Sequence, residues 1–200
     1  GGVYDAAVIA APANRAAAML SAEGDAPGAG AARVWLAGVR VRSSFTVTFR
    51  VDRPFPGDYF GLSFPRTTDI GRTIAAVCIQ GRKLPGLVPS GDALVVLPAP
   101  TVVTSLYEAE DGHIANAMLA VLEDAVKGIG RRVTHVHVQR FQDAYSIYEP
   151  GHLRRIAQLG TLPLPARVAL AGDYMTSASV EGAVRSGLAA ADRVFSGAGG

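Results

Sequence analysis

The chain has 200 residues, of which 19 are Lys or Arg, 17 are Asp or Glu and 49% are hydrophobic, so its formal net charge is +2. This composition excludes a disordered chain and a strongly basic nucleic-acid-binding protein. The sequence also contains no apolar run of about 18 residues, the length that spans a membrane. The single cysteine, Cys78, excludes internal disulfides and cysteine-based zinc sites and is typical of a reducing compartment. We therefore expect a cytoplasmic protein with one large domain or two small ones.

The N-terminal segment predicts a strand and a helix. Residues 3–12 form a short apolar run that ends at Pro12, which is typical of a buried strand. The alanine-rich residues 14–20 favour a helix. Residues 21–30 contain three Gly and one Pro among small residues, which predicts a flexible loop.

The clearest periodicity lies in residues 39–51, where apolar residues alternate with Arg, Ser, Thr and Asp. A period of two predicts a long strand with one buried and one wet face. Further strands are predicted at residues 59–64, 73–79, 93–97 and 102–107, which Gly and Pro separate. We therefore expect an antiparallel sheet in the middle of the chain.

The C-terminal part predicts helices alternating with strands. A helix is expected from Asp111 or Gly112, because Ile114, Met118 and Ala125 recur at helical spacing. The remaining predicted elements are a strand at 133–141, a helix at 150–159, a strand at 167–171 and a helix at 180–195 with Ser179 as its N-cap.

The sharpest local motif follows the predicted strand at residues 167–171. That strand ends in Gly172-Asp173, a polar loop follows, and the next helix begins with small residues such as Gly182 and Ala183. A helix N-terminus offers free N–H groups to an electron-rich ligand, small residues admit a bulky group, and a carboxylate can accept bonds from a sugar-like hydroxyl. An ordinary strand–loop–helix connection explains the same pattern equally well.

Residues 170–191 resemble the C-terminal FAD motif of the flavin-containing amine oxidase superfamily, which includes monoamine oxidases, protoporphyrinogen oxidases and phytoene desaturases. Three further segments resemble the family in its own order along the chain. They are residues 4–13, similar to the D-x-V-x-A-x-P strand; Lys83-Leu84-Pro85, near the Lys-aromatic-Pro segment; and residues 141–152, similar to a protoporphyrinogen-oxidase pattern.

The resemblance implies a mixed α/β and α+β fold. An antiparallel-sheet substrate domain would accompany the C-terminal part of a Rossmann-like FAD-binding domain. Residues 1–20 would then be the FAD-domain strand and hinge, residues 21–160 the sheet-rich substrate domain with helices, and residues 161–200 the C-terminal FAD-binding strand and helix.

The resemblance also implies that the cofactor is FAD. Gly172 would permit close approach, and Asp173 would bind the ribityl or pyrophosphate region. The helix start at Ser179, Val180 and Ala183 would face the flavin, with the Val180 N–H at the N1–C2=O edge.

Three residues would be catalytic on the same grounds: Lys83, which would hold a water near flavin N5, and Tyr145 and Tyr148, near the flavin and substrate. A solvated turn lysine and two core tyrosines are the structural alternatives. Ser146 replaces a Pro of the protoporphyrinogen-oxidase pattern.

The chain departs from the family in one large respect, because no strand followed by G-x-G-x-x-G is present and the glycines at 24, 28 and 30 are wrongly spaced. The sequence also begins Gly1-Gly2-Val3, without Met, and reaches a strand-like segment almost at once. We therefore expect the C-terminal half of a heteromeric FAD-dependent oxidoreductase. Its dinucleotide-binding half would be a second polypeptide, either the partner in a natural pair of subunits or the other piece of a fragmented polypeptide.

The expected reaction is hydride transfer from a C–N or C–C bond of a small organic substrate to the flavin. The alternative is a non-catalytic partner subunit that kept the fold but does not bind flavin. An enzyme of unrelated mechanism is a weaker third possibility, since no G-x-S-x-G elbow or other constellation is present.

The remaining candidate residues are weaker. His135 and His137 share one face of a predicted strand and could bind a metal, but no third ligand is evident, so a structural pair is favoured and no metal site is expected. His152 could cap a helix or bind a ligand. Cys78 lies in an apolar strand, where an inert buried thiol is the default.

Overall fold

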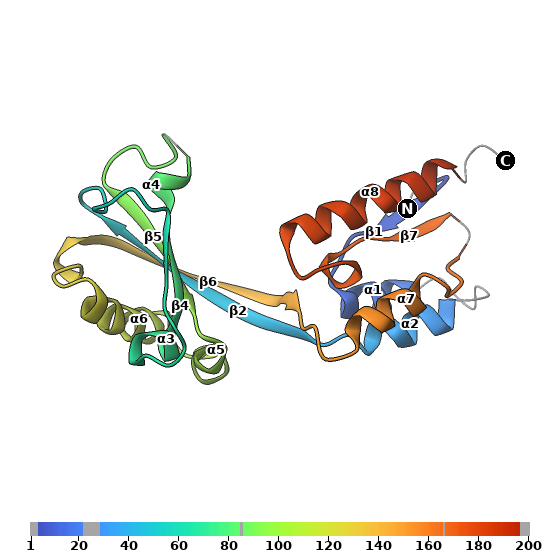
Figure 1. Cartoon of the computed structure of the whole chain (residues 1–200), viewed down its shortest axis with the longest axis horizontal. Coiled ribbons are helices and arrows are strands. Elements are labelled where there is room, and N and C mark those ends of the chain that lie inside the picture. Colours follow the sequence, from blue (N-terminus) through green and yellow to red (C-terminus); the bar gives the residue numbers. More distant parts are fainter. Residues whose placement is uncertain (1–3, 22–28, 85, 166, 197–200) are drawn as a thin grey trace. The chain divides into compact units, whose positions relative to one another are not determined.

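The elements of the chain fall into two compact units in the computed structural model, which describes residues 4–21, 29–84, 86–165 and 167–196. Unit 1 comprises residues 1–42 and 143–200, and unit 2 comprises residues 43–142. The chain passes between them along the long strands β2 (Val41–Val51) and β6 (Val133–Ser146) (Figure 1). The domain boundaries expected near residues 20 and 160 therefore differ from the observed unit boundaries, since both positions lie inside unit 1.

Unit 2 is built on a five-stranded sheet with the order β3-β4-β5-β2-β6. Its other strands are β3 (Gly61–Ser63), β4 (Ile74–Ile79) and β5 (Asp92–Pro98). The pairs β3–β4, β4–β5 and β5–β2 are antiparallel, which confirms the expected sheet. The alternation along β2 is confirmed too, because Phe45, Val47 and Phe49 are fully buried while the residues between them are half-buried.

Helices cover the buried face of this sheet. They include α3 (Asp69–Thr73), α5 (Pro100–Leu106) and α6 (Asp111–Ala125), the last as expected and buried through Ile114, Met118 and Leu122. The strand predicted at residues 102–107 is wrong, because α5 occupies this segment. Pro100 lies in the first turn of α5, a favourable position for proline, and Val103 packs into the core, so tertiary packing overrides the strand preference of Val102 and Val103.

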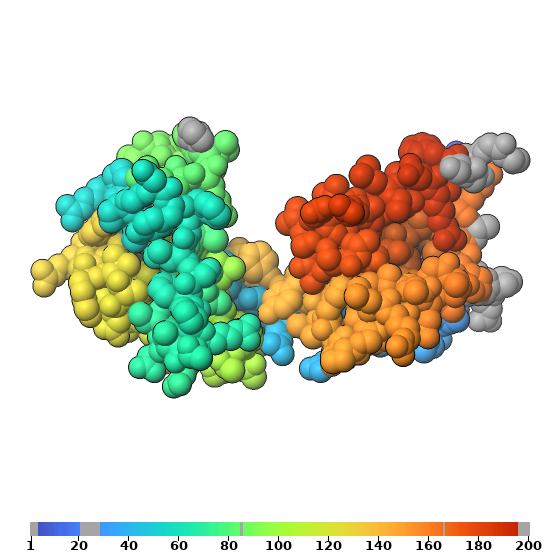
Figure 2. All heavy atoms as spheres, viewed as in Figure 1, coloured from blue at the N-terminus to red at the C-terminus, as the bar shows by residue number. Residues whose placement is uncertain are grey.

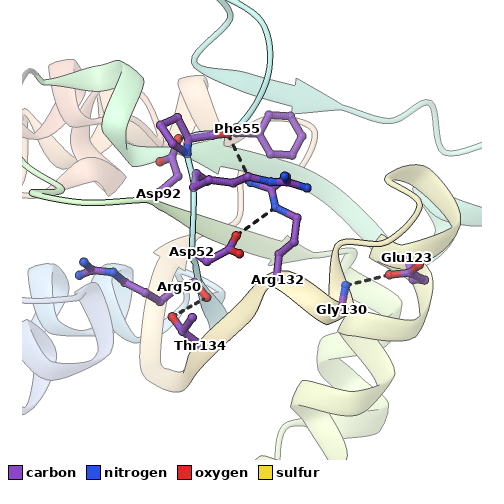
Figure 3. Close-up of polar contacts among 10 residues, drawn as sticks. Arg50, Asp52, Phe55, Asp92, Glu123, Gly130, Arg132 and Thr134 are labelled. Atoms are coloured by element: carbon purple, nitrogen blue, oxygen red, sulfur yellow. Dashed lines mark hydrogen bonds and ion pairs between the residues drawn. The ribbon is translucent and has the colours of Figure 1, made fainter.

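A buried carboxylate joins three backbone segments at one end of the unit 2 sheet. Asp92 is 1% exposed, and its carboxylate accepts hydrogen bonds from the N–H groups of Phe55 (3.1 Å), Gly81 (3.0 Å) and Ala93 (2.8 Å). Gly81 belongs to α4 (Gln80–Lys83). Nearby, Arg132 pairs with Asp52 at 3.3 Å (Figure 3). The Arg132 guanidinium also donates to the backbone carbonyls of Arg53 and Pro54. These polar contacts fix the loops around the start of α4.

Unit 1 is built on two parallel strands, β1 (Ala7–Ile9) and β7 (Val168–Leu170), with Val8 paired to Ala169. One core contains Leu20, Trp35, Leu159 and Tyr174 and joins these strands to the helices α1 (Ala13–Ser21), α2 (Ala29–Ala37) and α7 (His152–Leu159). The helix α8 (Val180–Ser196) packs through Ala190 against Ala169 and Ala171, and the short 3-10 helix η2 (Asp173–Met175) precedes it.

These elements confirm the expected helices at residues 14–20, 150–159 and 180–195 and the strand at 167–171, with shifts of a few residues at their ends. The helix α2 was not expected, and residues 22–28 of the predicted loop lie outside the described residues. In the described part of the chain, no helix is both long and apolar enough to cross a membrane.

The strand β1 differs from expectation in its burial. The apolar run at residues 3–12 predicts a buried strand, yet Ala7 is exposed and Val8 is 44% exposed. The physical reason is that β7 covers one edge of β1, and no described strand pairs with the other edge.

We expect Asp92→Ala to lower the free energy of unfolding by about 2–4 kcal/mol, because three backbone N–H groups lose their acceptor. Urea unfolding followed by circular dichroism measures this. Asp58→Ala is the matched control, because Asp58 is exposed, and its unfolding midpoint should equal that of the unaltered chain. Equal midpoints for both variants would contradict the anchoring role of Asp92.

Candidate functional site

A pocket of about 540 Å³ lies in unit 1. It is formed at the carboxyl ends of the parallel strands β1 and β7 and at the start of α8, the position where ligands bind in parallel sheets. Its lining residues are mostly small: Ala10, Ala11, Pro12, Asp143, Ala144, Tyr145, Ser146, Ala171, Gly172, Asp173, Ala178, Ser179, Val180, Ala183 and Gly187. Small residues leave the backbone accessible to a large flat ligand.

The first turns of α8 form one wall of the pocket through Val180, Ala183 and Gly187. Ser179 caps this helix as expected, because its hydroxyl accepts the N–H of Gly182 at 3.0 Å. The first N–H groups of a helix lack acceptors within the helix, and the helix dipole adds partial positive charge there. The wall therefore suits an electron-rich ligand group.

The carboxylate of Asp173 is fixed by one residue. The Ser146 hydroxyl donates to Asp173 Oδ1 at 2.9 Å, and the Ser146 N–H donates to Asp173 Oδ2 at 3.1 Å. A proline at position 146, as in the protoporphyrinogen-oxidase pattern, has neither donor. Each carboxylate oxygen keeps a further lone pair that can accept a bond from a ligand hydroxyl.

The backbone around Asp173 is held by three other side chains. The Tyr148 hydroxyl donates a hydrogen bond to the Asp173 carbonyl at 2.5 Å, and the His152 Nε2–H donates one to the Tyr174 carbonyl at 3.0 Å. The rings of Tyr148 and His152 stack with 4.0 Å between their centroids. The Gly172 N–H donates to Ser186 Oγ on α8 at 2.9 Å. The segment 172–174 is therefore fixed on several sides.

The two tyrosines of this cluster resist ionisation. Burial raises the pKa of Tyr148, and the nearby Asp173 charge raises it further. Burial raises the pKa of Tyr174 much more strongly, again with help from Asp173. Both hydroxyls therefore stay protonated and act as hydrogen-bond donors.

Two glycines are required by packing within the chain itself. A Cβ at Gly172 would lie 2.2 Å from the Tyr174 ring, and the extended φ of 165° at Gly172 is accessible to any residue. A Cβ at Gly182 would lie 2.1 Å from the Ser177 carbonyl oxygen. The bulky group expected to approach Gly182 is therefore the preceding loop, whereas Ala183 does line the pocket.

The pocket brings together the five residues predicted to bind the cofactor, Gly172, Asp173, Ser179, Val180 and Ala183. Of the predicted catalytic residues, Tyr145 also lines it. Tyr148 is not among the lining residues, and Lys83 is an exposed residue of α4 in unit 2.

The supporting roles of Ser146, His152 and Ser186 were not predicted from the sequence. The Gly151-His152 pair was a signal for His152, but no local pattern indicated Ser146 or Ser186 as anchors. His135 and His137 are exposed on β6, and the described residues contain no group of three or more His, Cys, Asp or Glu that could hold a metal. Cys78 is half-buried in β4 and unpaired with any other cysteine.

We expect Gly172→Ala to lower the free energy of unfolding by about 1–3 kcal/mol, because its Cβ would overlap the Tyr174 ring. Gly187→Ala is the matched control, since a Cβ there meets no atom within 4 Å and should leave the chain as stable or slightly more stable. In a Tyr174→Leu background, Gly172→Ala should cost less. Thermal unfolding of the four variants measures this, and an equal cost in both backgrounds would contradict the packing explanation.

We expect the stability of unit 1 to fall at alkaline pH. Tyrosine in the unfolded chain ionises near its ordinary pKa of 10.0, whereas folded Tyr148 and Tyr174 have raised pKa values. The contribution of the two tyrosines to the free energy of unfolding is therefore complete below pH 10. It is lost as the pH rises through the pKa values that they have in the folded chain. Tyr174→Phe should flatten the decrease above pH 10 in urea unfolding, and an unchanged slope would show that Tyr174 ionises normally.

Known proteins share the family and the fold of this chain. Residues 1–195 match the family described as flavin-containing amine oxidoreductase. A comparison with curated proteins gave no match.

Two solved structures are similar. The first is a protein from Exiguobacterium sp. 255-15 provisionally named protoporphyrinogen oxidase, with 19% identity and a TM-score of 0.65 over 94% of this chain and 40% of that one. The second is cyclohexylamine oxidase from Brevibacterium oxydans IH-35A, with 16% identity and a TM-score of 0.62 over 84% of this chain and 38% of that one. The chain thus spans about two fifths of each similar structure, and it belongs to the flavin-containing amine oxidoreductase family.

Proposed function

We propose that the pocket of unit 1 holds the flavin end of FAD. The chain would then be part of an FAD-dependent oxidoreductase that oxidises a C–N or C–C bond of a small organic substrate. One observation carries this proposal: five residues that match the FAD motif of the family line one pocket at the carboxyl ends of two parallel strands.

The residues present fit such a cofactor. The lining is dominated by Ala and Gly, which suits a flat ring system, and the start of α8 offers N–H groups to an electron-rich edge. Asp173 has lone pairs left for a hydroxyl-bearing chain. The fit therefore rests on shape, on hydrogen-bond donors and on one acceptor.

In this proposal the residues of the chain bind the flavin and stabilise its charge. When bound, the flavin supplies the redox chemistry by accepting a hydride from the substrate. The positive end of α8, at Val180, would stabilise the negative charge of the reduced ring, which favours reduction. Tyr145 would face the ring or the substrate. Lys83, whose side chain is exposed, would hold a water for the reaction in the complete enzyme.

We propose that the two units have different functions. Unit 1 would be the C-terminal part of a Rossmann-like FAD-binding domain, and unit 2, with its antiparallel sheet, would be the substrate domain. A second polypeptide would supply the strand and G-x-G-x-x-G turn that bind the pyrophosphate. The length of the similar structures supports the need for a further segment, because more than half of each has no counterpart in residues 1–200.

A second candidate function is a partner subunit that does not bind flavin. It is supported by the Asp173 carboxylate, because both of its oxygens already accept bonds from Ser146, as a purely structural aspartate would. Asp173→Ala separates the candidates: in the purified complex it should lower the flavin content if the pocket binds FAD and leave it unchanged if it does not.

We expect Gly187→Phe to abolish flavin binding without unfolding the chain, because a side chain at this position enters the pocket and meets no atom near its Cβ. Flavin absorbance per mole of complex should fall at least about tenfold. Ala189→Phe, at an exposed position on the same helix, is the control and should retain flavin. Full flavin content in folded Gly187→Phe would contradict the proposed site.

A further inference from the structure

We propose that the ion pair between Arg15 and Asp143 controls the reduction potential of the flavin in the pocket of unit 1. Asp143 adds a second carboxylate to the pocket wall, and Arg15 compensates its charge. Arg15 is thus a positioning residue that acts on the flavin through Asp143. The inference rests on the proposed function, because it requires that the pocket bind flavin.

The two residues lie on different elements that meet at the pocket. Arg15 lies in the first turn of α1, which begins directly after the lining residue Pro12. The Arg15 Nε–H donates to Asp143 Oδ2 at 3.1 Å, and Asp143 itself lines the pocket. The side chain of Asp143 is 15% exposed and that of Arg15 is 54% exposed. The negative charge is therefore largely withdrawn from water, whereas the positive charge is half in water.

The backbone at Asp143 shapes this wall of the pocket. Its φ of 54° is left-handed, a conformation that Asp and Asn tolerate better than most other residues. In a regular strand only alternate side chains face one side, yet the four consecutive residues from Asp143 to Ser146 all line the pocket. Ser146 in turn fixes the carboxylate of Asp173. Asp143 therefore begins the segment that ends in the anchor of the other carboxylate.

Local stability explains neither member of the pair. A positive charge in the first turn of a helix opposes the helix dipole, and Arg15 lies in such a turn. The carboxylate of Asp143 loses much of its hydration, and its left-handed backbone is strained. The ion pair offsets part of these costs, but a neutral residue at both positions would avoid the electrostatic ones. Residues that break local rules beside a pocket are typical of functional sites, which favours a role in the pocket.

The two carboxylates of the pocket have different partners. Asp143 pairs with the cationic Arg15, whereas the hydroxyl and N–H of Ser146, which bind Asp173, are neutral. Loss of the Arg15 charge would therefore leave an uncompensated negative charge at Asp143. Because the reduced ring is negatively charged, such a charge disfavours reduction, and an uncompensated guanidinium favours it.

The size of the pocket gives the scale of the effect. Another wall, α8, forms part of the surface of unit 1 (red in Figure 2), so water screens the charges of the pocket unless a ring system displaces it. A compact cavity of 540 Å³ is about 10 Å across, and at an effective dielectric constant of about 20 one charge changes the equilibrium between oxidised and reduced flavin on the order of tenfold. A tenfold change equals ~30 mV for a two-electron couple.

Potentiometric titration of the protein, purified from the organism that makes it, tests the pair. Arg15→Gln should lower the potential of the bound flavin by ~30 mV. Asp143→Asn keeps a residue that tolerates the left-handed backbone, and it should raise the potential by less, because the half-exposed Arg15 can turn into water. The double variant should return to the potential of the unaltered protein. Arg15→Lys retains the charge and should retain the potential.

Arg33→Gln is the matched control. It removes the same charge from an exposed residue of α2 that does not line the pocket, so the potential should stay unchanged. The half-exposed Arg15 and the exposed Arg33 should both be replaceable without unfolding the chain.

Three outcomes with flavin bound to the unaltered protein would overturn the role of the pair. The first is an equal potential in Arg15→Gln and Arg33→Gln. The second is a lowered potential that Asp143→Asn does not restore, as expected if the pair only stiffens the wall. The third is loss of flavin from Arg15→Gln alone, because the pair would then act on binding. Absence of flavin from the unaltered protein would instead remove the proposed function itself.

Discussion

The hydrogen bonds from Ser146 to the Asp173 carboxylate are the interaction on which the site depends. They connect the end of β6 to the turn that follows β7, and so they fix Asp173, one of the two carboxylates, with Asp143, that line the pocket. Tyr148, His152 and Ser186 hold the backbone on either side. A carboxylate fixed in this way needs no reorientation when a ligand arrives, which lowers the entropic cost of binding.

The same cluster changes the roles expected for two residues. Tyr148 was predicted near the flavin, but its hydroxyl is donated to the Asp173 carbonyl and its ring stacks on His152. Its effect on the pocket would therefore pass through Asp173. Gly172 was predicted to admit the cofactor, and the structure gives it a second task, because the Tyr174 ring packs directly against it. Both residues support the pocket from within the chain, and Tyr145 is left as the tyrosine that lines it.

Much of the fold could be predicted from local patterns. The period of two in β2 and the helical spacing of Ile114 and Met118 in α6 arise from one buried face each, so they are visible in the sequence. The segment of α5 could not be predicted in this way, because Val102 and Val103 favour a strand and only their packing in the folded protein selects a helix. The exposure of β1 was also hidden, since an apolar run carries no information on how many elements of the folded protein pack against the strand.

The candidate site was predicted as far as a resemblance could carry it. The motif at residues 170–191 identified the residues that line one side of the pocket. The roles of Ser146 and Ser186 were visible only in the folded structure, because their contacts join positions far apart in the sequence.

The central claim is that this pocket holds a flavin, and photolabelling of the assembled protein with an azido-flavin analogue tests it most directly. The label should map to peptides within residues 171–187 or 143–146, and labelling confined to residues outside unit 1 would contradict the claim.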